Sequence, residues 1–336
     1  MQDMRYGKFI GAACIYAAFA VYLYQPYFKN FDGLQYLLVV NVCLAALGCF
    51  VLSRRWVSSF AGSFIAGAIY GFGPFTLSLA KFHPTAGLLA ASIPWMFCPA
   101  AFVCRNKWRW LSWPISALPF LAIVIFFRIS IHYRLFSVPI GTRMQLGDLA
   151  GLIAPLAIAQ RSTTLVSFYH VPIIALLMGF AMLLAARRVG VIIILCLGTI
   201  LAFCDYFFSI SPIIWLTIPA VCCSVLIGVG LQALCSAGYA DRKWVLLAAV
   251  VSGALAIVTL LLATKYFQVF AGLGNSAARL LTESAKMYIL GTITAAIIFF
   301  LTRAKLRVTL LRRILLCSAM AVDIFFSARF VIDRVF

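Results

Sequence analysis

Long apolar runs follow one another along almost the whole sequence, and they constrain the fold more than any other feature. The 336 residues are 65% hydrophobic and only 10% charged, whereas a soluble domain carries about 25% charged residues. An α-helix needs about 20 mostly apolar residues to cross a bilayer, and runs of about that length recur along the chain. A transmembrane β-barrel would instead show alternating segments of about 10 residues. The sequence therefore predicts an all-α, polytopic transmembrane helical bundle.

Eleven apolar segments are predicted to span the membrane, within a single integral membrane domain that covers residues 1–336. These segments are residues 9–24, 36–52, 57–79, 86–103, 111–127, 171–186, 189–203, 213–233, 244–264, 287–301 and 314–331. Small residues at about four-residue spacing in the third segment would let neighbouring helices approach closely; they are Gly62, Ala66, Gly67 and Gly71. In the fifth segment, Pro114 and Pro119 are the expected kink points.

The distribution of basic residues predicts the orientation of these spans. With a cytoplasmic N-terminus and an outer C-terminus, sixteen of the 27 Lys and Arg fall at cytoplasmic ends of spans and eleven fall outside, four of them in one long outer segment. This bias is what the positive-inside rule expects. It also accounts for the net charge of +19, and since no basic tail or long basic helix is present, we expect no nucleic-acid partner.

The long outer segment, residues 128–170, is the longest stretch that is not simply an apolar span. Within it, residues 149–159 are apolar but too few to cross a membrane, which favours a re-entrant or interfacial helix. The segment also carries four arginines, whose planar guanidinium groups suit phosphate oxygens; they are Arg128, Arg134, Arg143 and Arg161. They predict a site for a phosphate or lipid head group, the alternative being helix ends anchored by side chains that snorkel to the lipid surface.

Only eight acidic residues are available for chemistry. Asp32 and Asp148 are the candidate catalytic bases, although a lone carboxylate in an Asp-Gly turn more often serves the turn itself and Asp148 is more often explained as a helix N-cap. Four further polar residues are expected to line an outer cavity; they are His83, His132, His170 and Asp205. Most of the eleven cysteines lie in apolar runs without C-x-x-C spacing, so no metal site is predicted from them.

Four stretches resemble the membrane region of bacterial GT-C-type glycosyltransferases, in particular the YfhO-like family. In residues 48–97 a helix ends at a basic pair, a small-residue helix runs to a Tyr-Gly-Phe turn, and an outer His precedes a helix with a central Pro. Residues 147–188, residues 195–234 and the sequence AVDIFFSARF are similar to the outer segment, a later span and the last helix of that family.

The resemblance implies transfer of a sugar from a polyprenyl-phosphate donor at the outer face of the bacterial cytoplasmic (inner) membrane. A carboxylate of the first outer loop would serve as base, and a divalent metal with the lipid-phosphate donor is the cofactor to consider. Membrane lipids and other membrane subunits are the expected partners. This chain departs from the family in that its first outer loop offers only Asp32, with no second acid beside it.

Three functions remain open on the sequence. The first is a GT-C-like enzyme with Asp32 or Asp148 as base and the four arginines as a phosphate clamp. The second, favoured by the scarcity of acids, is a non-catalytic structural or accessory subunit of a larger membrane complex. The third is a secondary transporter, which we rank last because Asp323 is the only acid inside a predicted span.

Overall fold

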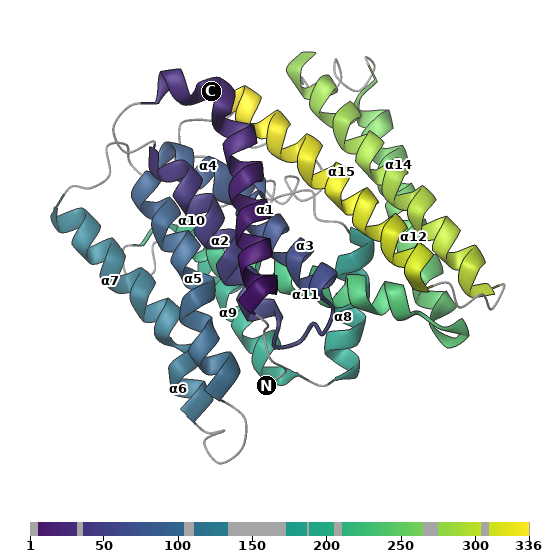
Figure 1. The fold of residues 1–336 in the computed structure, drawn as a ribbon, viewed down its shortest axis with the longest axis horizontal. Helices are drawn as coiled ribbons and strands as arrows, with labels where there is room; N and C mark the ends of the chain where they lie inside the picture. Colours follow the sequence, from purple (N-terminus) through teal and green to yellow (C-terminus); the bar gives the residue numbers. More distant parts are fainter. Residues whose placement is uncertain are drawn as a thin grey trace.

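The computed structural model describes residues 6–31, 36–103, 111–133, 173–186, 188–204, 210–264, 275–303 and 309–335. Within these ranges all regular secondary structure is helical. The helices are α1 (Tyr6–Tyr24), η1 (Gln25–Asn30), α2 (Leu37–Ser53), α3 (Phe60–Gly71), α4 (Pro74–Phe82), α5 (Pro84–Val103), α6 (Ser112–Ser116), α7 (Leu118–His132), α8 (Ile173–Ala185), α9 (Val189–Phe203), α10 (Pro212–Trp215), α11 (Thr217–Ser236), η6 (Tyr239–Asp241), α12 (Arg242–Leu262), α14 (Asn275–Arg303) and α15 (Thr309–Val335). The all-α prediction agrees with this architecture (Figure 1).

Each of the eleven predicted segments overlaps an apolar helix in the described part of the chain. Eight helical stretches there are long and apolar enough to cross a membrane, and three shorter apolar helices, Leu37–Ser53, Ala175–Ala185 and Val189–Phe203, accompany them. The structure thus has the composition and helix lengths of an α-helical membrane protein. The number of eleven crossings and the orientation stay predictions.

Helices with small residues occupy the centre of the bundle. α3 packs against α2 and α11, and α11 packs in turn against α8. A Cβ atom on Gly67 would lie 2.5 Å from the Ala46 carbonyl oxygen of α2, and one on Gly230 of α11 would overlap the Ala175 carbonyl of α8. The predicted close approach of helices through small residues is therefore present, since only glycine fits at these contacts.

The third predicted segment forms two helices instead of one. α3 ends at Gly71 and α4 begins at Pro74, a residue that suits a first helical turn because its missing N–H would have no partner there. The Thr76 hydroxyl donates to the Tyr70 carbonyl oxygen at 2.6 Å, which satisfies an acceptor at the break. In the fifth segment the helix is interrupted at Ala117, between the two prolines predicted to kink it.

Contacts between distant segments define two opposite ends of the bundle. At one end the Tyr27 hydroxyl, just after α1, donates to a carboxylate oxygen of Asp333 at 2.8 Å. α1 runs from the N-terminal end of the molecule to the end where the C-terminus lies (Figure 1). At the other end, the Arg312 guanidinium of α15 donates to the Ala237 carbonyl oxygen at 2.6 Å, just after α11. The first end corresponds to the predicted outer face and the second to the predicted cytoplasmic face.

Candidate functional site

Most of the predicted site lies outside the described residues. This holds for both candidate bases, for three of the four arginines, for one histidine and for the remaining acid, which are Asp32, Asp148, Arg134, Arg143, Arg161, His170 and Asp205. It also holds for the short helix predicted over residues 149–159. Their roles stay predictions, and the structure describes three members of the predicted site: Arg128, His132 and His83.

Arg128 and His132 lie on one exposed face of α7, four residues apart. Leu121 and Ile125 continue this face towards the start of the helix, and their side chains are 55% and 59% exposed. Contiguous exposed Leu and Ile side chains are unfavourable in water but fit the hydrocarbon of a bilayer. The exposed face of α7 is therefore an apolar stripe that ends in two basic side chains. This arrangement is expected where a helix leaves the hydrocarbon of the bilayer and meets lipid head groups.

The opposite face of α7 anchors the helix to the bundle. Ile123, Phe127 and Ser130 are buried, and the Phe120 ring lies 6.1 Å from the Trp215 ring of α10, centroid to centroid. Because the buried and exposed stripes alternate with helical periodicity, the packing of α7 fixes Arg128 on the outside of the bundle. Arg128 and His132 therefore face outward, as a lipid anchor or head-group contact would, instead of converging on an enclosed cavity.

His83 is buried, with 3% of its surface exposed, at the junction between α4 and α5. Its backbone N–H donates to the Leu79 carbonyl at 2.9 Å, and its own carbonyl accepts from the Gly87 N–H at 2.8 Å. The amide of the buried Asn41, on α2, donates to the adjacent Pro84 carbonyl at 3.2 Å. Burial lowers the pKa of the His83 imidazole below its ordinary value. The histidine thus sits inside a tightly packed helix junction, and its role in an outer cavity stays a prediction.

The acids of α15 are divided between core and surface. Asp323 is 8% exposed and faces the protein, as expected for an ionisable group within a span. Arg329 forms an ion pair with Asp333 at 3.5 Å, one helical turn further on. Among the described residues, no group of three or more His, Cys, Asp or Glu is placed to hold a metal ion.

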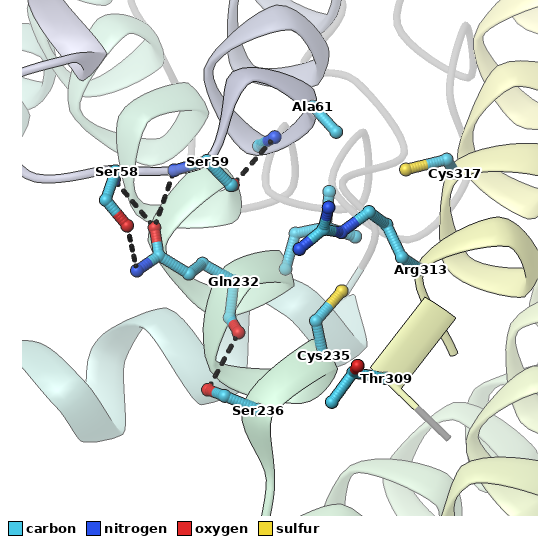
Figure 2. Close-up of a pocket in the computed structure, with 11 residues that line it drawn as sticks. Ser58, Ser59, Ala61, Gln232, Cys235, Ser236, Thr309, Arg313 and Cys317 are labelled. Atoms are coloured by element: carbon cyan, nitrogen blue, oxygen red, sulfur yellow. Dashed lines mark hydrogen bonds between the residues drawn. The ribbon is translucent and has the colours of Figure 1, made fainter. Parts of the chain in front are cut away.

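A polar junction at the other end of the bundle was not anticipated from the sequence. Gln232, near the end of α11, accepts hydrogen bonds from the backbone N–H groups of Ser58 and Ser59 at 2.8 and 3.3 Å, and its amide donates to the Ser58 hydroxyl at 2.9 Å (Figure 2). Gln232 could have indicated this junction in the sequence, because it is the only Asn, Gln or charged side chain in residues 213–233. Arg313 reaches into the same region from α15 (Figure 2).

The long apolar helices, their small-residue contacts and the lipid-compatible outer faces define an α-helical, multi-pass membrane protein. Comparison with protein-family models, with curated proteins and with solved structures finds no match to this chain.

Proposed function

We propose that this chain is a GT-C-like but non-catalytic membrane subunit that binds the phosphate of a lipid, in particular of a polyprenyl-phosphate-linked sugar, at the outer face of the cytoplasmic membrane. The observation that carries the proposal is the exposed face of α7, where Arg128 and His132 follow Leu121 and Ile125. An apolar stripe of this kind lies against a lipid chain, and the basic pair at its end meets the phosphate of the same lipid. Cations near a helix C-terminus are also favoured by the helix dipole.

The contact between the two chain-terminal regions supports an odd number of crossings, while the cytoplasmic placement of the N-terminus rests on the distribution of basic residues. Because Tyr27 follows the first span and Asp333 ends the last one, their hydrogen bond requires an even number of crossings between them. The total number of crossings is then odd, in keeping with eleven spans, a cytoplasmic N-terminus and an outer C-terminus. In that arrangement the C-terminal end of α7, which carries Arg128, is directed outward.

The catalytic alternative is transfer of a sugar from a polyprenyl-phosphate donor, with Asp32 or Asp148 as base. Such a reaction needs a carboxylate within hydrogen-bond reach of the acceptor hydroxyl in an enclosed site. The outward direction of Arg128 and His132 favours a surface contact with lipid over such a site, so we place the non-catalytic function first.

The test is binding of polyprenyl phosphate to the full chain in phosphatidylcholine nanodiscs, followed by native mass spectrometry. A basic side chain near an anionic surface contributes about 1 kcal/mol, so we expect Arg128→Gln to weaken binding about five-fold. The matched control is Arg188→Gln, which removes an exposed arginine at the N-terminus of α9, at the predicted cytoplasmic face; its binding should equal that of the wild type.

Equal binding by the wild type and Arg128→Gln would remove the basis of the proposal. Glycosyl transfer by the wild type that is abolished in Asp32→Asn or Asp148→Asn would replace the non-catalytic function with the enzymatic one.

A further inference from the structure

A cavity of about 150 Å³ opens at the end of the bundle opposite the Tyr27–Asp333 contact. It lies where the start of α3, the end of α11 and the start of α15 meet (Figure 2). A single water needs about 10–15 Å³ of such space, so the cavity has room for several waters or for a small polar group. This cavity is separate from α7 and from the lipid contact proposed above.

One guanidinium group supplies the charge of this cavity. Arg313 extends from α15 towards the cavity, next to the thiol of Cys235 (Figure 2). Within the part of the chain that the structure describes, no carboxylate lies within ion-pair distance of Arg313. A thiol is a weak hydrogen-bond acceptor. The N–H donors of the guanidinium would form stronger hydrogen bonds with an anion than they form with this thiol.

The positive character extends beyond Arg313. Arg54, at the end of α2, donates from its guanidinium to the carbonyl oxygen of Ser58, a residue of the cavity wall, at 2.9 Å. The nearby Asp241 carboxylate accepts a hydrogen bond from the Gly238 N–H at 2.9 Å and is not part of the wall. The cavity therefore combines basic neighbours with a wall that contains no acidic side chain among the described residues.

Five polar side chains stand in the wall beside the apolar Ala61 and Leu231. Ser58, Ser59, Gln232, Ser236 and Thr309 all line the cavity, and Gln232 is fixed by its three hydrogen bonds to the two serines of the α3 N-terminus. The Ser59 hydroxyl already accepts from the Gly62 N–H at 3.2 Å and so caps α3. One N–H of the helix end is thus capped by the protein itself, and the charged donors of the cavity belong to Arg313, an exposed side chain.

We propose that this cavity binds a phosphate group through the Arg313 guanidinium, with the Thr309 hydroxyl as a further donor. The phosphate is carried either by an anionic lipid of the adjacent leaflet or by a soluble phosphate compound. Both sources offer the oxygen atoms that a planar guanidinium binds in pairs. On binding, the phosphate takes the place of the thiol beside the guanidinium and covers Cys235 and Cys317, which line the same cavity.

These two cysteines give a direct measure of occupancy in the unmodified protein. The full chain is placed in phosphatidylcholine nanodiscs and treated with N-ethylmaleimide, and alkylation of each cysteine is followed by peptide mass spectrometry. One arm adds inorganic phosphate, and a second arm replaces part of the phosphatidylcholine with phosphatidic acid. Cys196, which is exposed on α9 and outside the cavity wall, serves as the internal control.

We expect slower alkylation of Cys235 and Cys317, with Cys196 unchanged, in at least one arm. Protection by inorganic phosphate identifies a soluble ligand, and protection by phosphatidic acid alone identifies a lipid head group. Equal alkylation rates with and without both phosphate compounds in the wild-type protein would overturn the proposal, and this result does not depend on any variant folding.

Substitution then identifies the binding group. Arg313→Gln should weaken the apparent affinity for the protecting phosphate at least ten-fold, which corresponds to about 1.4 kcal/mol, while Arg313→Lys should retain part of it. Arg55→Gln removes an exposed charge at the same end of the bundle but outside the wall, and should leave protection unchanged. Protection that survives in Arg313→Gln, or is lost equally in Arg55→Gln, would show that Arg313 does not hold the phosphate.

Discussion

The segment formed by α3 and α4 and the segment formed by α6 and α7 are both apolar enough to cross a membrane, yet they occupy opposite environments. In the most apolar 18-residue window of each, 94% of the residues are buried for Phe60–Phe82 and 22% for Ser112–His132. The buried segment is the less hydrophobic of the two. In a soluble protein the order would be reversed, because burial there follows the removal of apolar surface from water.

Side-chain size and polarity explain the difference. Lipid chains are as apolar as Leu, so exposing Ile or Leu to them costs little, and helices associate instead through close packing and polar contacts. α3 offers Gly62, Gly67 and Gly71 to its neighbours, and its break is closed by the Thr76 hydroxyl. α7 carries branched and aromatic side chains on both faces. Residue size therefore indicates which membrane helices are central, and hydropathy only indicates that they are membrane helices.

The largest effect should come from a matched pair of isoleucines, one in each segment. Ile69 of α3 is 4% exposed and Ile125 of α7 is 59% exposed. Ile69→Ala leaves a cavity in the core and should cost about 2–5 kcal/mol of stability. Ile125→Ala exchanges one lipid contact for another and should stay within about 0.5 kcal/mol. Unfolding midpoints in the same detergent measure both, and equal losses would contradict the contrast between the two segments.

A smaller effect is expected from adding one methyl group to the central contact. A Cβ on Gly67 would meet both the Tyr16 hydroxyl and the Ala46 carbonyl oxygen, whereas a Cβ on Gly11 of α1 has no atom within 4 Å. Gly67→Ala should therefore destabilise the protein by about 1–3 kcal/mol. Gly11→Ala should be neutral or slightly stabilising, because alanine favours a helix more than glycine does. A Gly67→Ala protein as stable as the wild type would argue against close helix approach as the reason for the central place of α3.

The smallest effect should be the pH dependence contributed by His83, which ends α4. Its pKa is lowered by burial, so as the pH falls below about 6.5 the unfolded chain takes up the proton before the folded protein does. Stability is therefore complete above that pH and decreases as the pH falls towards the folded-state pKa. The unfolding midpoint of the wild type should drop more between pH 7 and pH 5 than that of His83→Gln. Parallel drops in the two proteins would assign the pH dependence to other groups.

The helical class and the positions of the apolar helices could be predicted from the sequence, because run length and composition alone determine them. The small residues of the third segment also indicated close packing, and the two prolines of the fifth segment bracket an actual interruption at Ala117. The break between α3 and α4 was not predicted. Pro74 and the hydrogen bond from the Thr76 hydroxyl to the Tyr70 carbonyl both mark the break, and neither has a signature in the hydropathy profile.

The candidate site was harder to predict than the fold. Arg128 and His132 were predicted for the outer segment after the fifth span and lie in the last two turns of α7; their outward direction depends on which face of that helix packs against Trp215. His83 was expected to line an outer cavity, which stays a prediction, and its burial at the junction of α4 and α5 follows from helix packing that the sequence does not show. The cavity at Arg313 combines three helices that are far apart in the sequence, and such a convergence follows from tertiary packing and not from local pattern.

The hydrogen bond from Tyr27 to Asp333 joins residues 306 positions apart, and α1 also contacts α15 through the Phe19 and Phe325 rings, 6.2 Å between centroids. Ribosomes add about 5–20 residues per second, so about 15–60 s separate the synthesis of these two partners. During that interval α1 is already in the bilayer without the helix that completes its contacts. The side of α1 that meets α15 is thus without its protein partner until α15 has been made, and lipid or a chaperone covers it during that time.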